Sequence, residues 1–218
     1  MLSARLIQWS GLAAIVGGVL WMVYGVFEMV EPWGRAVLYR PELGYELVTN
    51  APLYRVYSLP GSVALFLTAL GLLGVAIWCR LPVGRLGKLG VVLASTVVGV
   101  AVLSALGVLI LFVPLFFAGV VLGSFILGAA TFLLAVDARN VSVPSPWTTA
   151  LLALGIMGLL LLPLRPLVFA VALIPPGVAA GFIALFGLGW LAAGFRLWLE
   201  SRQQASGRWS TSEIKRSE

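Results

Sequence analysis

Histidine is absent from the 218-residue sequence, and cysteine occurs only once, at position 79. The absence of histidine removes the most common metal ligand and proton shuttle in proteins, and with it haem ligation by two imidazoles. A single cysteine excludes a disulfide within the chain. The sequence therefore predicts neither a metal site nor a cofactor.

Charge is also scarce. Charged residues make up 10% of the chain, against about 25% in soluble proteins, whereas 61% of the residues are hydrophobic and fall mostly in long runs. This composition predicts an all-α, polytopic integral membrane protein, with the lipid bilayer as its first partner. The net charge of +6 does not indicate a nucleic-acid partner, because Lys and Arg concentrate in the cytoplasmic loops of membrane proteins.

Six membrane-spanning helices are predicted in a single transmembrane domain over residues 1–200, followed by a disordered cytoplasmic tail over residues 201–218. The first run is longer than a signal-peptide core and is not followed by a cleavage site, so it is expected to be a retained span. The predicted spans cover residues 6–27, 58–78, 89–111, 115–136, 147–162 and 178–199.

Proline and serine set several of these boundaries. Ser58 and Pro60 are expected as N-cap and first turn of the second span. Pro114 divides the uncharged run 89–136 into the third and fourth spans. Residues 163–177 are apolar but contain four prolines, which predicts an interfacial or re-entrant segment between the fifth and sixth spans.

Basic residues are distributed unevenly in this arrangement, with ten on the side of the two termini and four on the other. The positive-inside rule then places both termini in the cytoplasm and residues 28–57 outside, as the long outer loop between the first and second spans. Four tryptophans near the cytoplasmic interface support the same register: Trp9, Trp78, Trp147 and Trp198. The expected location is the inner membrane of a prokaryotic cell.

The outer loop is chemically the richest segment. Its aromatic and arginine side chains are of the types that dominate binding hot spots, but an interfacial anchoring belt has the same composition, and we weigh the two interpretations equally. The segment RPELGYELV could form a short amphipathic helix on the membrane. The candidate ligand- or partner-binding residues are Trp33, Arg35, Tyr39, Arg40, Tyr45, Tyr54, Arg55 and Tyr57.

Two carboxylates follow the first span. Glu28 and Glu31 could form an outward-facing cation or proton site with Arg35, because a spacing of three places them on one helical face. Pro32 indicates, however, that the helix is ending there. Solvated interfacial carboxylates, which cost little, are the preferred interpretation.

Small residues recur at helical spacing in several spans. Such faces allow close approach of helix backbones in lipid, and GVVLG matches the G-x-x-x-G pattern. They could form a subunit-association surface, although packing within the bundle is favoured. The candidate packing residues are Ser10, Ala14, Gly18, Ser95, Gly99, Gly119, Gly123, Gly177 and Gly181, with Gly189 and Ala193 as a further pair.

The interiors of the second to sixth spans lack ionisable and amide side chains. Proton pumps and ion-coupled transporters need such groups near mid-membrane, and an intramembrane hydrolase needs a base beside its nucleophile. The chain is therefore expected not to be an enzyme. The first hypothesis is a non-catalytic subunit that packs against and stabilises or organises other membrane components, whether protein, lipid or pigment. Its partners would be other membrane subunits or further copies of itself.

The alternative is a solute-binding component of a membrane transporter, with residues 28–57 as a lid. In span number, size, inferred orientation and a long outer loop after the first span, the chain resembles the substrate-binding subunits of energy-coupling-factor vitamin transporters. The resemblance is one of architecture, and the small residues of the first span are the only shared sequence feature. It implies a solute site but assigns no residue to it.

Overall fold

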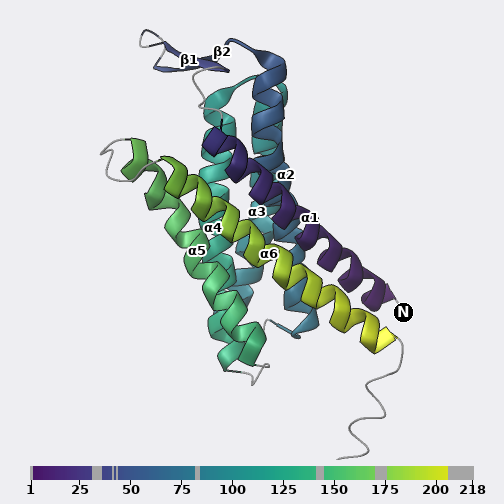
Figure 1. Cartoon of the computed structure of the whole chain (residues 1–218). Helices are drawn as coiled ribbons and strands as arrows, with labels where there is room; N and C mark the ends of the chain where they lie inside the picture. The colour runs from purple at the N-terminus through teal and green to yellow at the C-terminus, as the bar shows by residue number, and fades with distance from the viewer. Residues whose placement is uncertain are drawn as a thin grey trace, which may run out of the picture.

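The computed structural model describes residues 2–30, 36–40, 42, 44–81, 84–140, 145–169 and 176–205. Within these residues the chain forms six helices and one two-stranded sheet (Figure 1). The prediction of a six-helix, all-α chain is confirmed, apart from that small sheet. The helices are α1 (Leu2–Val30), α2 (Ala51–Trp78), α3 (Arg85–Leu109), α4 (Val113–Arg139), α5 (Ser145–Phe169) and α6 (Pro176–Ala205).

Long apolar stretches run through these helices. Over the described residues, α1, α2, α3, α4 and α6 are each long and apolar enough to cross a membrane. The apolar part of α5, Pro146–Leu161, is shorter. The chain thus has the helices expected of a multi-span membrane protein. Because α6 continues to Ala205, the predicted tail begins later than residue 201, and residues 206–218 lie outside the described part.

The start of α2 differs from the prediction. The helix begins at Ala51, where the Asn50 side chain accepts a hydrogen bond from the Leu53 backbone N–H at 3.2 Å and Pro52 occupies the first turn. Ser58 is fully buried and Pro60 lies inside the helix. The same N-cap and proline signal occurs twice in the sequence, and the earlier one starts the helix.

The end of α5 also differs. Helix α5 continues through Pro163 and Pro166 to Phe169, and α6 already begins at Pro176. The predicted end of the fifth span near residue 162 is therefore wrong, because residues 163–169 continue that helix, and residues 170–175 lie outside the described part of the chain. An interfacial or re-entrant position for residues 163–177 stays a prediction. Pro163 and Pro166 lack a backbone N–H, so each removes one hydrogen bond from the helix. An irregular chain would leave more backbone groups unpaired in an apolar setting than this helix does.

The turn between α3 and α4 occupies residues 110–112, with Pro114 in the first turn of α4 as expected. Leu111 has a φ of 62°, and the Phe112 N–H bonds back to the Gly107 carbonyl at 2.8 Å. These local bonds allow a connection without polar side chains. The two helices consequently pack as an antiparallel pair.

The segment expected as an amphipathic helix is a β-hairpin. Strands β1 (Val37–Arg40) and β2 (Tyr45–Val48) pair antiparallel, with Val37 opposite Val48 and Arg40 opposite Tyr45. Gly44 adopts a φ of 70°, which glycine accepts without steric cost, and its N–H bonds to the Arg40 carbonyl at 3.1 Å. The β-branched and aromatic side chains beside that turn favour strands.

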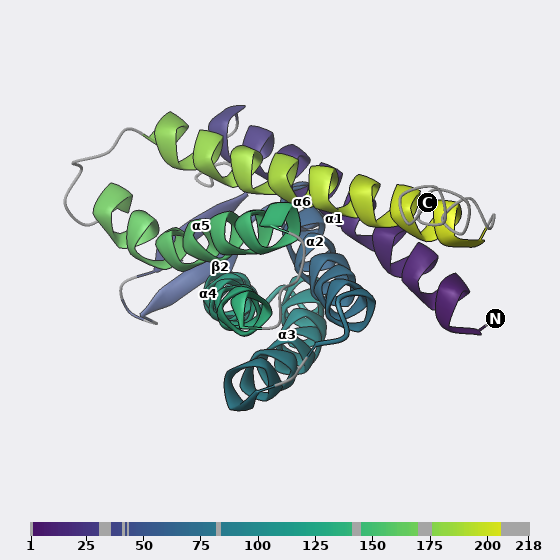
Figure 2. The same ribbon diagram turned by 90° about the horizontal axis from the view of Figure 1, so that it is seen from below.

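The helices follow one another around the bundle in sequence order. Each helix packs against the next, α6 closes the ring on α1, and α2 also touches α4. Figure 2 shows α1 and α6 together along one side of the bundle and α3 at the opposite edge. The large aromatic side chains of the core are fully buried: Trp21, Tyr24, Tyr54, Phe116, Trp147, Phe186 and Trp190.

Candidate functional site

The predicted binding residues of the outer loop do not form one cluster in the described part of the chain. Trp33 and Arg35 lie outside the described residues. Tyr39 and Tyr45 belong to the strands of the hairpin, where their side chains are not described, and Arg40 is exposed at the end of β1.

Two of the predicted tyrosines belong to the packed interior. Tyr54 is 1% exposed and meets Phe116 edge-on, with ring centroids 6.1 Å apart. Tyr57 is half-buried and meets Phe27 of α1 edge-on, with centroids 5.0 Å apart. These rings pack the start of α2 against α1 and α4.

Arg55 is the predicted binding residue with the most informative contact. Its side chain is exposed, and its Nη2 donates a hydrogen bond to the backbone carbonyl of Leu109 at 3.2 Å. Leu109 ends α3, where unpaired carbonyls carry partial negative charge that a cation stabilises. Arg55 therefore caps the end of a neighbouring helix while its side chain stays exposed.

The carboxylates considered as a charged site are only partly described. Glu28 is half-buried in the last turn of α1, so that helix continues past the predicted end of the span. Glu31 and Arg35 lie outside the described residues. A shared cation or proton site between them stays a prediction.

The three predicted packing residues of α1 lie in contacts within the bundle. Ser10 and Ala14 of α1 face Gly74 and Gly71 of α2. Gly18 faces α6, and a methyl group added to it would lie 2.5 Å from the backbone nitrogen of Leu191. Helix α1 is thus packed closely against two helices at once.

The contact between α1 and α6, which we call the α1–α6 seam, is built from glycines spaced by seven residues. Gly11, Gly18 and Gly25 of α1 face α6, whose Gly187 and Gly194 face back. Methyl groups on Gly187 and Gly194 would lie 2.6 and 2.7 Å from the carbonyl oxygens of Gly18 and Gly11. The two backbones touch, and the start of α1 lies beside the end of α6.

Ser104 of α3 links three helices in the core. Its hydroxyl donates to the Phe116 carbonyl of α4 at 3.1 Å and lies 2.8 Å from the Ser62 hydroxyl of α2, which is therefore the donor in that pair. Gly119 of α4 leaves room for Ser104, since an added methyl would lie 2.5 Å from the Ser104 Cβ, and Gly123 faces Leu65. The buried hydroxyls of Ser62 and Ser104 are thereby satisfied within the bundle.

Two other predicted packing glycines face open space. A methyl group added to Gly99 of α3 or Gly181 of α6 would meet no atom within 4 Å. Gly177 is the second residue of α6, and its surroundings are not described. Neither Gly99 nor Gly181 therefore contributes to close packing inside the bundle.

The outward side of α3 carries an apolar surface, which we call the α3 outer face. It is centred on Gly99, and the Ser95 hydroxyl beside it is satisfied by the Val91 carbonyl at 3.0 Å. Side chains on both sides of Gly99 are more than half exposed. The α3 outer face comprises Val92, Ser95, Gly99, Leu103 and Ile110.

A polar cluster that the sequence did not predict lies at the other end of the bundle. Glu200 of α6 accepts hydrogen bonds from the indole N–H groups of Trp78 and Trp147 at 3.0 and 2.9 Å through Oε2, and from Arg196 Nε at 2.7 Å through Oε1. The Arg196 guanidinium also lies 5.2 Å from the centre of the Trp147 ring. The cluster fastens α6 to α2 and α5. The i, i+4 spacing of Arg196 and Glu200 was the available signal for it.

Asp137 is a second unpredicted structural carboxylate. It lies near the end of α4, is 3% exposed, and accepts a hydrogen bond from the Gly84 backbone N–H at 3.0 Å. Gly84 is the N-cap residue of α3 and has no side chain to cap that helix. An anion at a helix N-terminus is favourable, so Asp137 supplies from α4 the cap that α3 lacks.

Protonation equilibria are shifted at two described groups outside the helices. Burial, with the nearby Glu200 carboxylate adding to it and Arg196 opposing it, raises the pKa of the Cys79 thiol to about 12. Burial also raises the pKa of the Glu46 carboxyl in β2. Cys79 is therefore a thiol, not a nucleophilic thiolate, at neutral pH. Among the described residues, no three His, Cys, Asp or Glu side chains gather where they could hold a metal ion.

The chain matches no protein-family model, no curated protein and no solved structure, so its function has to be inferred from its own residues and their contacts.

Proposed function

We propose that the protein is a non-catalytic integral membrane subunit that binds another membrane protein, or a second copy of itself, through the α3 outer face. The observation that carries this proposal is Gly99, a glycine in the middle of an exposed apolar face. Apart from the backbone of its own helix, no atom of the described residues lies within 4 Å of a methyl group added to it. Most other described glycines in the helices face a neighbouring helix. A small residue on a membrane helix allows a second helix to approach closely.

The interior of the bundle supports the same proposal. Its centre is filled by aromatic side chains such as Trp21, Phe186 and Trp190, and Ser62 and Ser104 bond to each other. A solute-binding transport component would need polar space below the hairpin, where Tyr54 and Phe116 pack edge-on instead. We therefore favour the subunit over the solute-binding alternative.

For orientation we propose that both termini lie in the cytoplasm. The ends of α1 and α6 that adjoin each other, together with the α2–α3 and α4–α5 connections, carry ten of the fourteen basic residues, counting those of the segment after α6. The opposite end of the bundle carries the other four, among them Arg40, Arg55 and Arg165. This distribution matches the positive-inside rule. The inner membrane of a prokaryote stays a prediction, to be tested by membrane fractionation.

The test is purification of the tagged full-length chain from its own membrane in mild detergent, followed by mass analysis of the intact complex. Gly99→Leu fills the hollow of the α3 outer face, and Gly181→Leu is the matched control, because it adds the same side chain at another glycine with open space around it. Overpacking costs about 1–3 kcal/mol, so we expect Gly99→Leu to weaken association by roughly fivefold or more.

The possible outcomes are distinct. A stoichiometric protein partner, or a dimer mass, that is retained with Gly181→Leu and lost with Gly99→Leu supports the proposal. A partner that is insensitive to Gly99→Leu would move the interface away from α3. A lone chain that carries a small molecule would favour the transporter alternative.

A further inference from the structure

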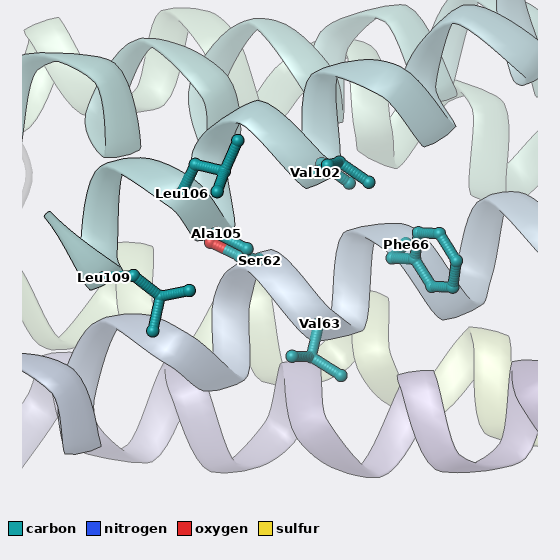
Figure 3. Close-up of a pocket in the computed structure, with 8 residues that line it drawn as sticks. Ser62, Val63, Phe66, Val102, Ala105, Leu106 and Leu109 are labelled. Atoms are coloured by element: carbon teal, nitrogen blue, oxygen red, sulfur yellow. The ribbon is translucent and has the colours of Figure 1, made fainter.

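A groove lies between α2 and α3, beside but not on the α3 outer face. It has a cavity volume of about 260 Å³. Figure 3 shows its lining, in which Ser62, Val63 and Phe66 come from α2 and the other side chains from α3, including Val102, Ala105, Leu106 and Leu109. Ser62 is the one polar side chain of this lining, and its hydroxyl is already bonded to Ser104. The groove is consequently a site for hydrocarbon.

One end of the groove meets a cation. Leu109, which lines the groove, is also the residue whose carbonyl accepts the hydrogen bond from Arg55. Arg55 is 23 residues from the end of α2 at Trp78, a rise of about 35 Å. A hydrocarbon core is about 30 Å thick, so Arg55 lies at the membrane interface when Trp78 lies at the opposite one.

The length of the groove matches one leaflet. Along α2, Ser62 and Phe66 lie seven and eleven residues beyond Arg55, or about 10 and 17 Å further into the membrane. Along α3, the lining extends from Leu109 back to Ala101, a distance of about 12 Å. Half of a hydrocarbon core is about 15 Å, so the groove runs from the interface to mid-membrane.

We propose that this groove binds one acyl chain of a phospholipid whose anionic phosphate group lies at Arg55. The shape and lining of the groove favour an acyl chain, because it is narrow, almost wholly apolar and bounded by side chains of two helices. The charge favours an anionic headgroup, since Arg55 is exposed and the described residues place no carboxylate in ion-pair contact with it.

The experiment measures lipid binding to the purified, delipidated full chain by native mass spectrometry. The probes are phosphatidylglycerol and phosphatidylcholine with identical acyl chains, and inorganic phosphate as competitor. Arg55→Gln removes the cation, and its matched control is Arg85→Gln, an exposed arginine at the other end of α3. Ala105→Phe fills the groove, and its control is Leu185→Phe at an exposed position of α6. Val102→Phe replaces Ala105→Phe if thermal unfolding shows that the latter does not fold.

We expect the wild-type chain to bind phosphatidylglycerol more tightly than phosphatidylcholine. Arg55→Gln should lower the ratio of the affinities for the two lipids about fivefold, because that is the effect of one basic side chain at an anionic surface. Arg85→Gln should leave this ratio unchanged. Ala105→Phe should weaken the binding of both lipids, and Leu185→Phe the binding of neither. Equal binding by Arg55→Gln and Arg85→Gln, or unaltered binding by the groove-filling variant, would overturn the proposal. Displacement of the lipid by inorganic phosphate would also overturn it, because the affinity would then come from Arg55 alone and not from the groove.

Discussion

Glu200 illustrates how one carboxylate can hold three helices together. Two indole N–H groups and one guanidinium N–H converge on its two oxygens at 2.7–3.0 Å. The two tryptophans, Trp78 and Trp147, were predicted as anchors for the membrane interface. Both lie near helix ends, where such anchors are expected. What the sequence could not reveal is that residues 122 and 53 positions away share a single partner.

We expect Glu200→Ala to lower the free energy of unfolding in detergent micelles by about 2 kcal/mol, because hydrogen bonds to a charged group contribute about 1.5–3 kcal/mol and their donors would be left without an acceptor. Denaturant titration followed by tryptophan fluorescence measures the change. The control is Glu42→Ala at an exposed position of the hairpin turn. Equal stability of the two variants would show that solvent replaces the Glu200 contacts at no cost.

The raised pKa of Cys79 predicts low reactivity. With a pKa of about 12, roughly one thiol in ten thousand is ionised at pH 8, whereas a free cysteine with a pKa near 8.5 is ionised to a substantial fraction. Alkylation by iodoacetamide at pH 8 should therefore be about a thousandfold slower at Cys79 than at a cysteine placed at exposed position 85 in a Cys79→Ser background. The rate at Cys79 should keep rising tenfold per pH unit above pH 9, since thiolate is the reactive form. Similar rates at the two positions would contradict the burial of this thiol.

At the scale of helices, the α1–α6 seam depends on glycines spaced by seven residues in both helices. The four-residue spacing that the sequence analysis followed identifies Gly18 but selects Gly177 and Gly181 in α6, whereas the contacting residues are Gly187 and Gly194. A spacing of seven keeps residues on one side of two helices that cross at a small left-handed angle. With 25 glycines in the chain, several spacings fit by chance, so the sequence does not specify the partner.

Gly18→Ala should destabilise the bundle by about 1–3 kcal/mol, because the added methyl would lie 2.5 Å from the backbone of Leu191 and neither helix can give way locally. Gly181→Ala, on the partner helix but facing open space, should leave the free energy of unfolding unchanged. Thermal unfolding of the purified variants compares them. Loss of stability in both would trace the effect to glycine content and not to the seam.

Helix number and order were predictable from the sequence, while several helix ends were not. Uncharged runs of roughly 20 residues or more identify spans because of the length that a bilayer requires. Caps are less specific: Asn50 with Pro52 and Ser58 with Pro60 are equally good start signals, and only packing around the buried Ser58 distinguishes them. The prolines of α5 predicted a helix end near residue 162, but the helix continues through them to Phe169. Within residues 28–57, composition selected Arg55 and Tyr54 alike, and it could not show that the fold exposes the first and buries the second.

At the scale of the whole molecule, the seam brings the start of the first helix beside the end of the last. Gly11 lies against Gly194, and the connections at that end carry most of the basic residues. An even number of membrane crossings likewise places both termini of a protein on the same side of the membrane. The packing and the charge distribution therefore favour the same topology.

Cysteine accessibility in intact cells tests that topology. In a Cys79→Ser background, Tyr45→Cys in the hairpin should react with a membrane-impermeant maleimide, and Arg208→Cys should react only after the membrane is permeabilised. The reason is that the hairpin precedes α2 and position 208 follows α6, and the start of α2 and the end of α6 lie at opposite ends of the bundle (Figure 1). The reverse labelling pattern would invert the proposed orientation, and labelling of both from outside would rule out an even number of crossings.

The pairing of α1 with α6 also governs how the chain can be made. Residues 31–175 separate the two helices, and at about 5–20 residues per second a ribosome needs roughly seven to thirty seconds to synthesise them. During that interval the glycine face of the first helix is in the membrane without its most extensive partner. A nascent chain released before Pro176 never acquires that partner, so we expect cellular quality control to recognise unfinished copies by an unoccupied first helix.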